Sequence, residues 1–367
     1  MLKRIEKRGK LFLARRASSL FDTRKMTPDD LNAETIENIL VIRQHNQMGD
    51  MLCAVPAFRG IRNRFPGARI SLVAAPINAL VMNGNPYIDE ILTYSKEGQR
   101  RDPFTLPRFI RSLRRRKYDL AIVMSTVSFS ITSMFLAVLS GARIRVGSTS
   151  RPFGHDLTSY YYNIELPLPS KDELETMHEA RHNLFPLEDI GVREDDLRSL
   201  IVPIADDEMD CRRLKDVIDP ERQGYMVIHP GAGKKQNIWP PARFAEVASL
   251  LTERYGFPVV AIRGPVDDDS FSSFLDESSH VPVVLSCPTT GLLAAMMRDA
   301  AVTLCNDTGV MHIAGAVGAG CVAVFGPTEP ARWKPVNSNV LAVRADDGKV
   351  SSIEVAEVLA AARSLID

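Results

Sequence analysis

The stretch from Val41 to Pro76 decides the fold and reads VIRQHNQMGDMLCAVPAFRGIRNRFPGARISLVAAP. A short apolar run ends in polar residues, a segment with helical periodicity follows, and Pro66-Gly67 marks a turn into a second apolar run. This order of strand, helix and strand predicts a parallel sheet with helices on both faces. It also places Asp50 at the point where the strand gives way to the helix.

The same alternation continues through the first half of the chain. It predicts strands at 38–43, 68–75, 90–94, 119–124 and 142–147, with helices at 51–64, 107–116 and 127–139. Residues 165–222 are acidic and hold several prolines without a clean strand rhythm, which indicates a helix and turn leading into a linker. A helix at 206–218 would precede a second sheet.

The rhythm restarts at GYMVIHPGAG, residues 224–233. Further strands are expected at 258–264, 281–286, 301–307 and 320–326, and helices at 242–255, 268–278, 290–299, 309–317 and 350–365. The predicted fold class is α/β, with two Rossmann-like doubly wound domains facing a central cleft. The expected division is a basic extension at 1–36, a first domain at 37–200 and a second at 201–367, whose last helix packs on its own domain or back on the first.

Length and composition are those of a soluble enzyme or binding protein. A chain of 367 residues is too long for one ordinary core, and its formal net charge of zero gives no global field that would recruit nucleic acid. No apolar run approaches the roughly 20 residues that span a bilayer, and no secretory signal begins the chain. Five scattered cysteines predict apolar fillers in a reducing compartment, so we expect a cytoplasmic protein.

Two segments depart from this neutrality. Residues 1–25 carry nine Lys or Arg against two acids, and residues 100–117 carry eight against one. Basic helices of this kind rest on anionic membrane surfaces or bind phosphorylated lipids, and the first would make the protein peripheral on the inner face of the cytoplasmic membrane. The alternative is a solvated helix face and a basic terminus without a partner.

The first candidate site residues follow the first predicted strand. No GxGxxG motif and no GxxxxGK[ST] loop is present, which disfavours a dinucleotide-dependent dehydrogenase and excludes a P-loop. Asp50 is either a helix-start residue stabilised by free amides or a general base. His45 is an alternative base or a structural polar residue.

Two further polar stretches follow strands of the second half. In HPGAGKKQNIWPPARF, small residues let backbone amides approach an anion, and Lys234 or Lys235 either neutralises a phosphate or is merely solvated. Trp239 is expected to be a packing anchor. In RGPVDDDSF, the acids at 267–269 are either helix caps or acceptors for ribose hydroxyls.

The last polar stretch begins NDTGVMH. Asn306 and Asp307 end a strand, so the amides of Thr308 and Gly309 would open a helix and suit a diphosphate. His312, five residues after Asp307, would reach the same anion.

Three stretches in this order resemble the bacterial heptosyltransferases of glycosyltransferase family 9. They are ILVIRQHNQMGDMLCAVPAFRGIRNRFPGARI, HPGAGKKQNIWPPARFAEVA and NDTGVMHIAGAVGAGCVAVFGPTEPARW, and the resemblance runs from Ile39 to about Pro335. It implies a GT-B fold and an inverting transfer from a nucleotide-activated sugar. The usual donor is ADP-L-glycero-β-D-manno-heptose, and the usual acceptor is the inner core of lipopolysaccharide.

The resemblance also implies roles for individual residues. Asp50 matches the candidate catalytic base. The donor-binding positions would be Lys234 or Lys235, Asp267 or Asp268, Asp307, Thr308, Gly309 and His312. Where the family commonly reads Ser-Ser-x-Gly-Asp, this chain has His45, Asn46 and Gln47 before Met48-Gly49-Asp50, on the expected acceptor and sugar side.

The expected reaction is a single displacement without a cofactor. Amides, a lysine and His312 would stabilise the leaving diphosphate in place of a metal ion, since no convincing paired-carboxylate metal motif is present. Three alternatives remain: a transferase with another nucleotide-sugar donor and a non-lipopolysaccharide acceptor, a nucleotide-sugar epimerase, and a non-catalytic sugar-nucleotide-binding or glycan-binding protein.

Overall fold

The computed structural model describes residues 23–44, 47–95, 102 and 104–367. His45 and Asn46, most of the basic segment 1–25 and part of 100–117 lie outside these residues. The described chain forms two compact units. Unit 1 holds residues 23–44, Ala54–Met82 and, with the gap given above, Pro86–Leu197. Unit 2 holds Gln47–Cys53, Asn83–Asn85 and Arg198–Asp367.

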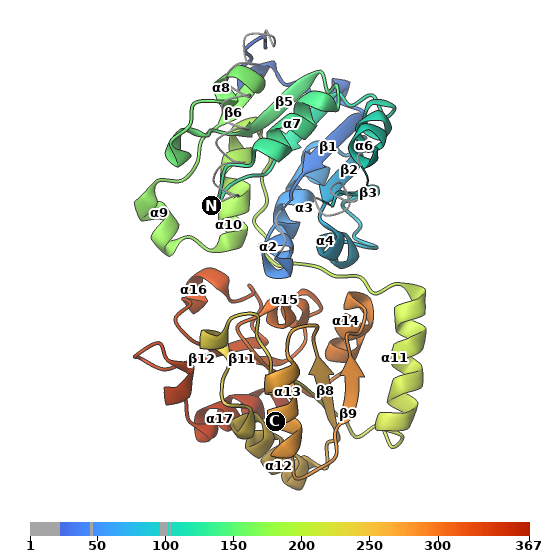
Figure 1. Cartoon of the computed structure of the whole chain (residues 1–367), viewed down its shortest axis with the longest axis vertical. Coiled ribbons are helices and arrows are strands. Elements are labelled where there is room, and N and C mark those ends of the chain that lie inside the picture. Colours follow the sequence, from blue (N-terminus) through green and yellow to red (C-terminus); the bar gives the residue numbers. More distant parts are fainter. Residues whose placement is uncertain (1–22, 45–46, 96–101, 103) are drawn as a thin grey trace. The chain divides into compact units, whose positions relative to one another are not determined.

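Unit 1 is built on a parallel six-stranded sheet of order β3-β2-β1-β4-β5-β6 (Figure 1). Its strands are β1 (Asn38–Ile42), β2 (Arg69–Ala74), β3 (Glu90–Thr93), β4 (Leu120–Val123), β5 (Ile144–Ser148) and β6 (Ile164–Leu166). Its α-helices are α3 (Val55–Arg64), α4 (Pro76–Val81), α6 (Thr105–Arg114), α7 (Ile131–Leu139), α8 (Thr158–Tyr161), α9 (Lys171–Thr176) and α10 (Glu179–Leu184). Its 3₁₀ turns are η2 (Pro28–Asp30), η3 (Ala33–Thr35), η4 (Arg151–Phe153) and η5 (Phe185–Ile190).

Unit 2 is built on a second parallel six-stranded sheet of order β12-β11-β10-β7-β8-β9. Its strands are β7 (Met226–His229), β8 (Val259–Arg263), β9 (Val283–Ser286), β10 (Val302–Asn306), β11 (Cys321–Phe325) and β12 (Val340–Arg344). Its α-helices are α2 (Met48–Leu52), α11 (Ala205–Ile218), α12 (Pro241–Tyr255), α13 (Asp268–Asp276), α14 (Thr290–Arg298), α15 (Gly309–Ala316), α16 (Pro330–Trp333) and α17 (Val355–Ile366). Its 3₁₀ turns are η6 (Lys235–Asn237) and η7 (Val350–Ser352).

The two sheets share one topology. Counted within its own unit, each sheet has the order 3-2-1-4-5-6, which is that of the Rossmann fold. The strand order reverses between β1 and β4 in unit 1, and between β7 and β10 in unit 2. Ligands of such sheets bind outside the carboxyl ends of the strands at this reversal, so the topology directs attention to the loops after β7 and β10.

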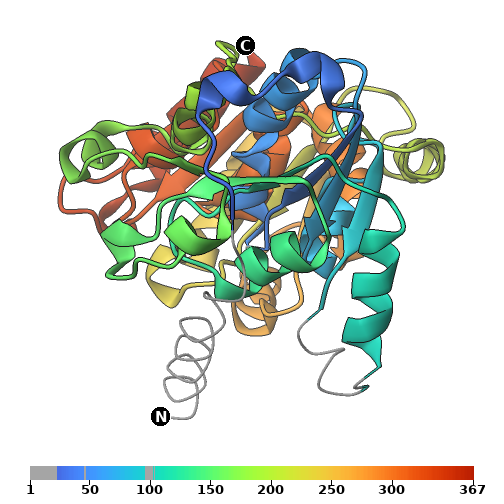
Figure 2. The same cartoon turned by 90° about the horizontal axis from the view of Figure 1, so that it is seen from above.

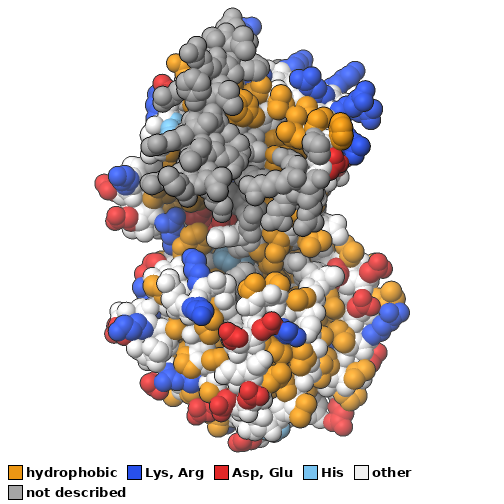
Figure 3. Space-filling model, in the orientation of Figure 1, with side chains coloured by type: hydrophobic (Ala, Val, Ile, Leu, Met, Phe, Trp, Pro, Cys, Tyr) orange, Lys and Arg blue, Asp and Glu red, His pale blue; other side chains and the backbone are white. Residues whose placement is uncertain are grey.

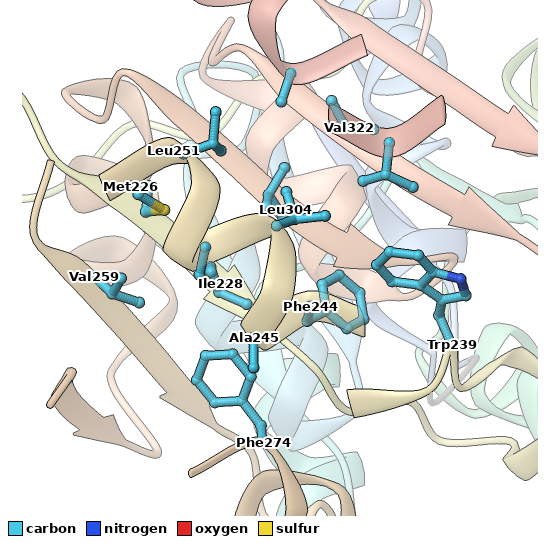
Figure 4. Close-up of a cluster of buried hydrophobic side chains, with 14 of the residues drawn as sticks. Met226, Ile228, Trp239, Phe244, Ala245, Leu251, Val259, Phe274, Leu304 and Val322 are labelled. Atoms are coloured by element: carbon cyan, nitrogen blue, oxygen red, sulfur yellow. The ribbon is translucent and has the colours of Figure 1, made fainter. Parts of the chain in front are cut away.

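The core of unit 2 explains why its helices cover the sheet. β7 and β10 are fully buried along their length and pack under α12, α13 and α17. Figure 4 shows Trp239, Phe244 and Leu304 among the side chains of this cluster. Trp239 is fully buried, meets Phe244 edge to face with centroids 4.8 Å apart, and donates its indole N–H to Ile353 O at 3.0 Å. The prediction that Trp239 anchors packing is confirmed.

The structure corrects several predicted elements. The single helix expected at 51–64 is two helices, α2 and α3, with a break at Cys53-Ala54. Pro56 explains the break, because it lacks an N–H and its ring would clash with the carbonyl of Leu52 in a continuous helix. β6 and β12 were not predicted. Each lies at one edge of its sheet. β6 has only three residues, too few for a periodic pattern, whereas β12 has the five-residue apolar run VLAVR and was missed.

The cysteines were expected to be buried apolar fillers, and no helix was expected to span a membrane. Cys53, Cys211, Cys305 and Cys321 are buried thiols, as fillers would be, but Cys287 is exposed, so the filler prediction is wrong for that residue. Among the described helices, none combines the length and the apolar character needed to cross a bilayer.

Candidate functional site

The start of α15 lies at the strand-order reversal of unit 2. β10 ends at Asn306 and α15 begins at Gly309, with only Asp307 and Thr308 between them. Thr308 is the N-cap, and its hydroxyl accepts a hydrogen bond from the Val310 amide at 3.3 Å. The first-turn amides and the helix dipole make such a helix start favourable for an anion.

Asp307 comes directly before this cap and is half-buried. Its carboxylate accepts a hydrogen bond from the Asn237 side chain at 3.2 Å. Burial raises the pKa of Asp307, although a hydrogen bond from Thr328 and the charge of Lys234 act in the opposite direction. The structure therefore brings together residues from the loops after β7, β10 and β11.

The two candidate lysines differ in their surroundings. Both side chains are exposed. Lys234 lies close enough to Asp307 for its charge to act on that carboxyl, whereas Lys235 opens η6. The effect of its charge on Asp307 favours Lys234 over Lys235 as the lysine on the side of α15.

Asn306 organises the loop after β7, and the sequence analysis gave it no role. Its side chain is fully buried. Its oxygen accepts the Trp239 amide at 2.9 Å, while its nitrogen donates to Pro230 O at 3.0 Å and to Gly231 O at 3.1 Å. A polar residue at the end of an otherwise apolar strand was the signal that could have identified it.

Asp267 and Asp268, at the start of α13, have different environments. Asp267 is 5% exposed, and its Oδ2 accepts hydrogen bonds from His229 Nε2 at 2.8 Å and from the Gly264 amide at 2.9 Å. Burial alone would raise its pKa, but these hydrogen bonds and the charge of His229 leave the pKa of Asp267 lowered. Asp268 is exposed and pairs with Arg263 at 2.6 Å.

The carboxylate of Asp267 does not cap its helix. Asp267 occupies the N-cap position of α13, yet its side chain makes no capping hydrogen bond there. It reaches back to the loop after β8 and across to the last residue of β7 instead. His229 is the second residue of this region that the sequence analysis passed over, since one histidine at a strand end gives little signal by itself.

The short helix α2 packs on α15 within unit 2. A Cβ on Gly49 would lie 2.6 Å from His312 Cδ2, and one on Gly309 would lie 3.3 Å from Met48 Cβ. Cys53 Sγ is 3.9 Å from His312 Nδ1. Helix α2 thus lies against the first turns of α15, although about 260 residues separate them in the sequence.

This packing places Asp50 and His312 on neighbouring helices. Asp50 is a half-buried residue in the first turn of α2, and His312 is 5% exposed. Gln47 is the exposed N-cap of α2 and its side chain makes no capping hydrogen bond. Within residues 23–44, 47–95, 102 and 104–367, no cluster of three or more His, Cys, Asp or Glu is arranged to hold a metal ion.

Comparison with known proteins gives a consistent family. The sequence model of glycosyltransferase family 9 (heptosyltransferase) matches residues 106–360, which is more than half of the chain. Lipopolysaccharide heptosyltransferase 3 of Escherichia coli is 24% identical over 318 residues, covering 82% of this chain and 86% of that protein.

Solved structures agree on the fold. A family 9 glycosyl transferase from Veillonella parvula superposes with a TM-score of 0.79 at 23% identity, covering 90% of this chain and 97% of that one. The E. coli ADP-heptose lps heptosyltransferase II gives a TM-score of 0.73 at 20% identity, covering 90% and 98%. The fold is therefore GT-B, and the chain belongs to glycosyltransferase family 9 and is a glycosyltransferase.

Proposed function

We propose that the protein transfers a sugar with inversion from a nucleotide-sugar donor to a lipopolysaccharide core or a related glycan. The donor that we favour is ADP-heptose. Similarity to a lipopolysaccharide heptosyltransferase and to an ADP-heptose heptosyltransferase supports this choice. Within the division proposed from the sequence, residues 37–200 bind the acceptor, residues 201–367 bind the donor, and residues 1–36 are an extension.

One observation carries the proposal. The start of α15 is a helix terminus of the kind that suits an anion, at the strand-order reversal of a Rossmann-type sheet, and the helix that bears Asp50 packs directly on α15. A diphosphate at Thr308 and Gly309 would lie near Lys234. A carboxylate able to accept a proton would then lie one helix away.

The proposed reaction is a single displacement. Asp50 takes the proton of an acceptor hydroxyl while that oxygen attacks the anomeric carbon, and the bond from this carbon to the diphosphate breaks. Negative charge builds on the leaving diphosphate. The amides of Thr308 and Gly309, Lys234 or Lys235 and His312 stabilise that charge, and a preorganised donor of this kind contributes about 3 kcal/mol. These groups replace a metal ion, so we propose that the reaction needs none.

A second element of the proposal concerns where the protein works. Helix α6 packs Leu106, Phe109 and Leu113 against the core of unit 1. Its exposed side carries Arg108, Arg111, Arg114 and Arg115, followed by exposed Lys117. No acid occurs between Phe104 and Tyr118 in the sequence.

The position of α6 suits contact with a flat anionic surface. Figures 1 and 2 both show α6 at the margin of unit 1, and Figure 3 shows Lys and Arg side chains gathered beside hydrophobic ones on that side. The side chain of Phe104, 65% exposed, lies at the end of this face. We propose that α6 holds the enzyme on the cytoplasmic face of a membrane with anionic lipids, where each basic residue contributes about 1 kcal/mol.

The alternatives share the fold. A family member with another donor and a non-lipopolysaccharide acceptor would keep the α15 site, because a diphosphate is common to all such donors. A non-catalytic sugar-nucleotide-binding protein would also keep it. The residue that separates an enzyme from a binding protein is Asp50.

The test combines donor identification with one substitution. Thermal unfolding is measured with ADP-, GDP- and UDP-sugars, since the preferred donor raises the melting temperature. Transfer is then assayed for wild type and Asp50→Asn. We expect Asp50→Asn to bind the donor normally and to lose 10²- to 10⁴-fold in kcat, which is the usual contribution of a general base.

The matched control is Asp206→Asn, which removes an exposed acid from the first turn of α11. It should cost only the helix-dipole contribution of about 0.3–1 kcal/mol in stability and leave transfer unchanged. If Asp50→Asn behaves like this control, Asp50 is a helix-start residue and the mechanism is wrong.

A further inference from the structure

His229 and Asp267 form a buried pair that the proposed mechanism does not use. His229 ends β7 and Asp267 directly precedes α13, so the two residues come from the loops after adjacent strands β7 and β8. Their side chains are 7% and 5% exposed, and Nε2 of the imidazole is 2.8 Å from Oδ2 of the carboxylate. The same Oδ2 accepts the amide of Gly264 at 2.9 Å.

The hydrogen bonds determine how the ring is used. Nε2 carries the hydrogen, because it faces a carboxylate that can only accept. Nδ1 is buried and has no hydrogen-bond partner in the described part of the chain. Nε2 is therefore the ring nitrogen that connects His229 to Asp267.

Two glycines make room for the carboxylate. A Cβ on Gly231 would lie 2.7 Å from Asp267 Cβ and still closer to its carboxyl carbon, and a Cβ on Gly264 would lie 3.2 Å from that carbon. Any side chain at either position would displace Asp267. The loops after β7 and β8 thus approach each other through glycine backbones, with the carboxylate between them.

The loop that follows His229 is also held by hydrogen bonds from Asn306. Pro230 and Gly231, the two residues after His229, are held through their carbonyls by Asn306. Two sets of hydrogen bonds, joined by the backbone from His229 to Gly231, therefore connect the loop after β8, the loop after β7 and the end of β10. The set at Asn306 lies immediately before Asp307, Thr308 and the start of α15.

Stability alone is a poor reason for such a pair. Burying a hydrogen-bonded pair of ionisable groups brings little net stability, because desolvation offsets the attraction. Glycines also lose more backbone entropy on folding than other residues. The arrangement does fix two loops at the edge of the sheet where Rossmann-type folds bind ligands.

We infer that His229 and Asp267 are positioning residues for the donor, which hold the loop 230–234 and its lysine in place through the Nε2 hydrogen bond. Asp267 then acts on His229 and Gly264, not on the ribose of the donor. The inference rests on the proposed donor site. It assigns a role to one of the two candidate acids and adds a histidine to the site.

The sharpest test compares His229→Gln with His229→Asn. The amide nitrogen of Gln reaches about as far as Nε2, whereas that of Asn reaches only as far as Nδ1, so Gln restores the hydrogen bond to Asp267 and Asn does not. Dissociation constants for ADP are measured by calorimetry on the full chain. We expect His229→Gln to stay within about threefold of wild type and His229→Asn to bind at least tenfold more weakly.

A second comparison separates positioning from ribose contact. Asp267→Ala should weaken ADP and 2′-deoxy-ADP by the same factor, at least tenfold, because a misplaced loop affects both ligands alike. In transfer assays the donor KM should rise while kcat stays within about twofold. Asp276→Asn, which changes an exposed acid at the last residue of α13, is the control and should leave both dissociation constants unchanged.

The outcomes that overturn the inference are distinct from failure of the donor site. Equal affinity of His229→Asn and His229→Gln, or a loss confined to ADP in Asp267→Ala, refutes positioning through Nε2. If His229→Asn does not fold, the comparison of the two nucleotides in Asp267→Ala decides alone. If wild type binds none of ADP, GDP and UDP, the donor site itself is refuted and the inference falls with it.

Discussion

The carboxyl edges of the two sheets can be compared strand for strand, because both units have the same strand order. In unit 2, Asn306 joins the ends of β10 and β7, and Asp267 joins those of β7 and β8. In unit 1, Gln44 after β1 accepts one long hydrogen bond, 3.4 Å, from Ser133. Thr126 after β4 has a buried hydroxyl without a partner in the described residues.

This difference separates what topology supplies from what side chains supply. The strand order fixes where a ligand can bind in either unit. Among the residues that the structure describes, the edge of unit 2 has several hydrogen bonds of 2.8–3.1 Å between buried side chains and neighbouring loops, which preorganise this edge for one kind of ligand. The donors that we propose share a diphosphate whereas their acceptors differ, and this is why we propose unit 2 as the donor side.

The largest expected effect concerns the close approach of loops in unit 2. Gly231→Ala puts a Cβ into the carboxyl group of Asp267, and overpacking of this kind costs about 3 kcal/mol. Gly233, two residues further along the same loop, has open space around its Cβ position. Gly233→Ala should be neutral or stabilise by about 0.4–1 kcal/mol, since it restricts the unfolded chain.

Urea unfolding of the two glycine variants measures both values. If Gly231→Ala and Gly233→Ala have similar free energies of unfolding, the loops of unit 2 can move to accommodate the added Cβ at Gly231. Asp267 would then not be held rigidly between the loops after β7 and β8.

The next effect belongs to the surface of unit 1. Arg111→Gln combined with Arg115→Gln removes two charges from the exposed side of α6 and should weaken binding to vesicles with anionic lipid by about 30-fold, at about 1 kcal/mol per charge. Sedimentation with phosphatidylglycerol-containing vesicles measures the affinity. Arg212→Gln combined with Arg213→Gln, on α11 of unit 2, is the matched control and should change nothing. Equal losses in both double variants would indicate a nonspecific charge effect.

The smallest expected effect is a change in the pH dependence of stability when Asp307, at the start of α15, is replaced. Burial raises the pKa of Asp307, so its contribution to stability falls as pH rises from the unfolded pKa of about 3.9 through the folded pKa. Asp307→Asn should therefore be more stable than wild type at pH 7, and the gain should shrink towards pH 4. Thermal unfolding between pH 4 and 8 measures the difference.

Asp347 supplies a control of opposite sign. Hydrogen bonds from the Lys349 amide and the Ser352 hydroxyl lower the pKa of this exposed carboxyl. Its contribution is present above the unfolded pKa and disappears as pH falls through the folded pKa. Asp347→Asn should be less stable than wild type at pH 7, and the loss should vanish in acid. A loss of stability at pH 7 in Asp307→Asn would contradict the raised pKa.

The sequence was sufficient for most of the fold. Apolar runs and helical periodicity are local signals, and they located β1 to β5, β7 to β11 and the helix that follows Thr308. The family and the GT-B fold followed from three motifs in order. Local signals were insufficient at Pro56, where a predicted helix divides in two, and at β6, which has only three residues; the run VLAVR of β12 did carry a signal and was missed.

Part of the candidate site was also predictable from local sequence, and part was not. The sequence by itself determined that Thr308 and Gly309 open a helix after a buried strand, because cap and strand are neighbours in the chain. Only the tertiary structure decided that His229 pairs with Asp267 and that α2 packs on α15. These partners are far apart in sequence, and no local periodicity encodes which buried polar groups meet when strands and helices pack.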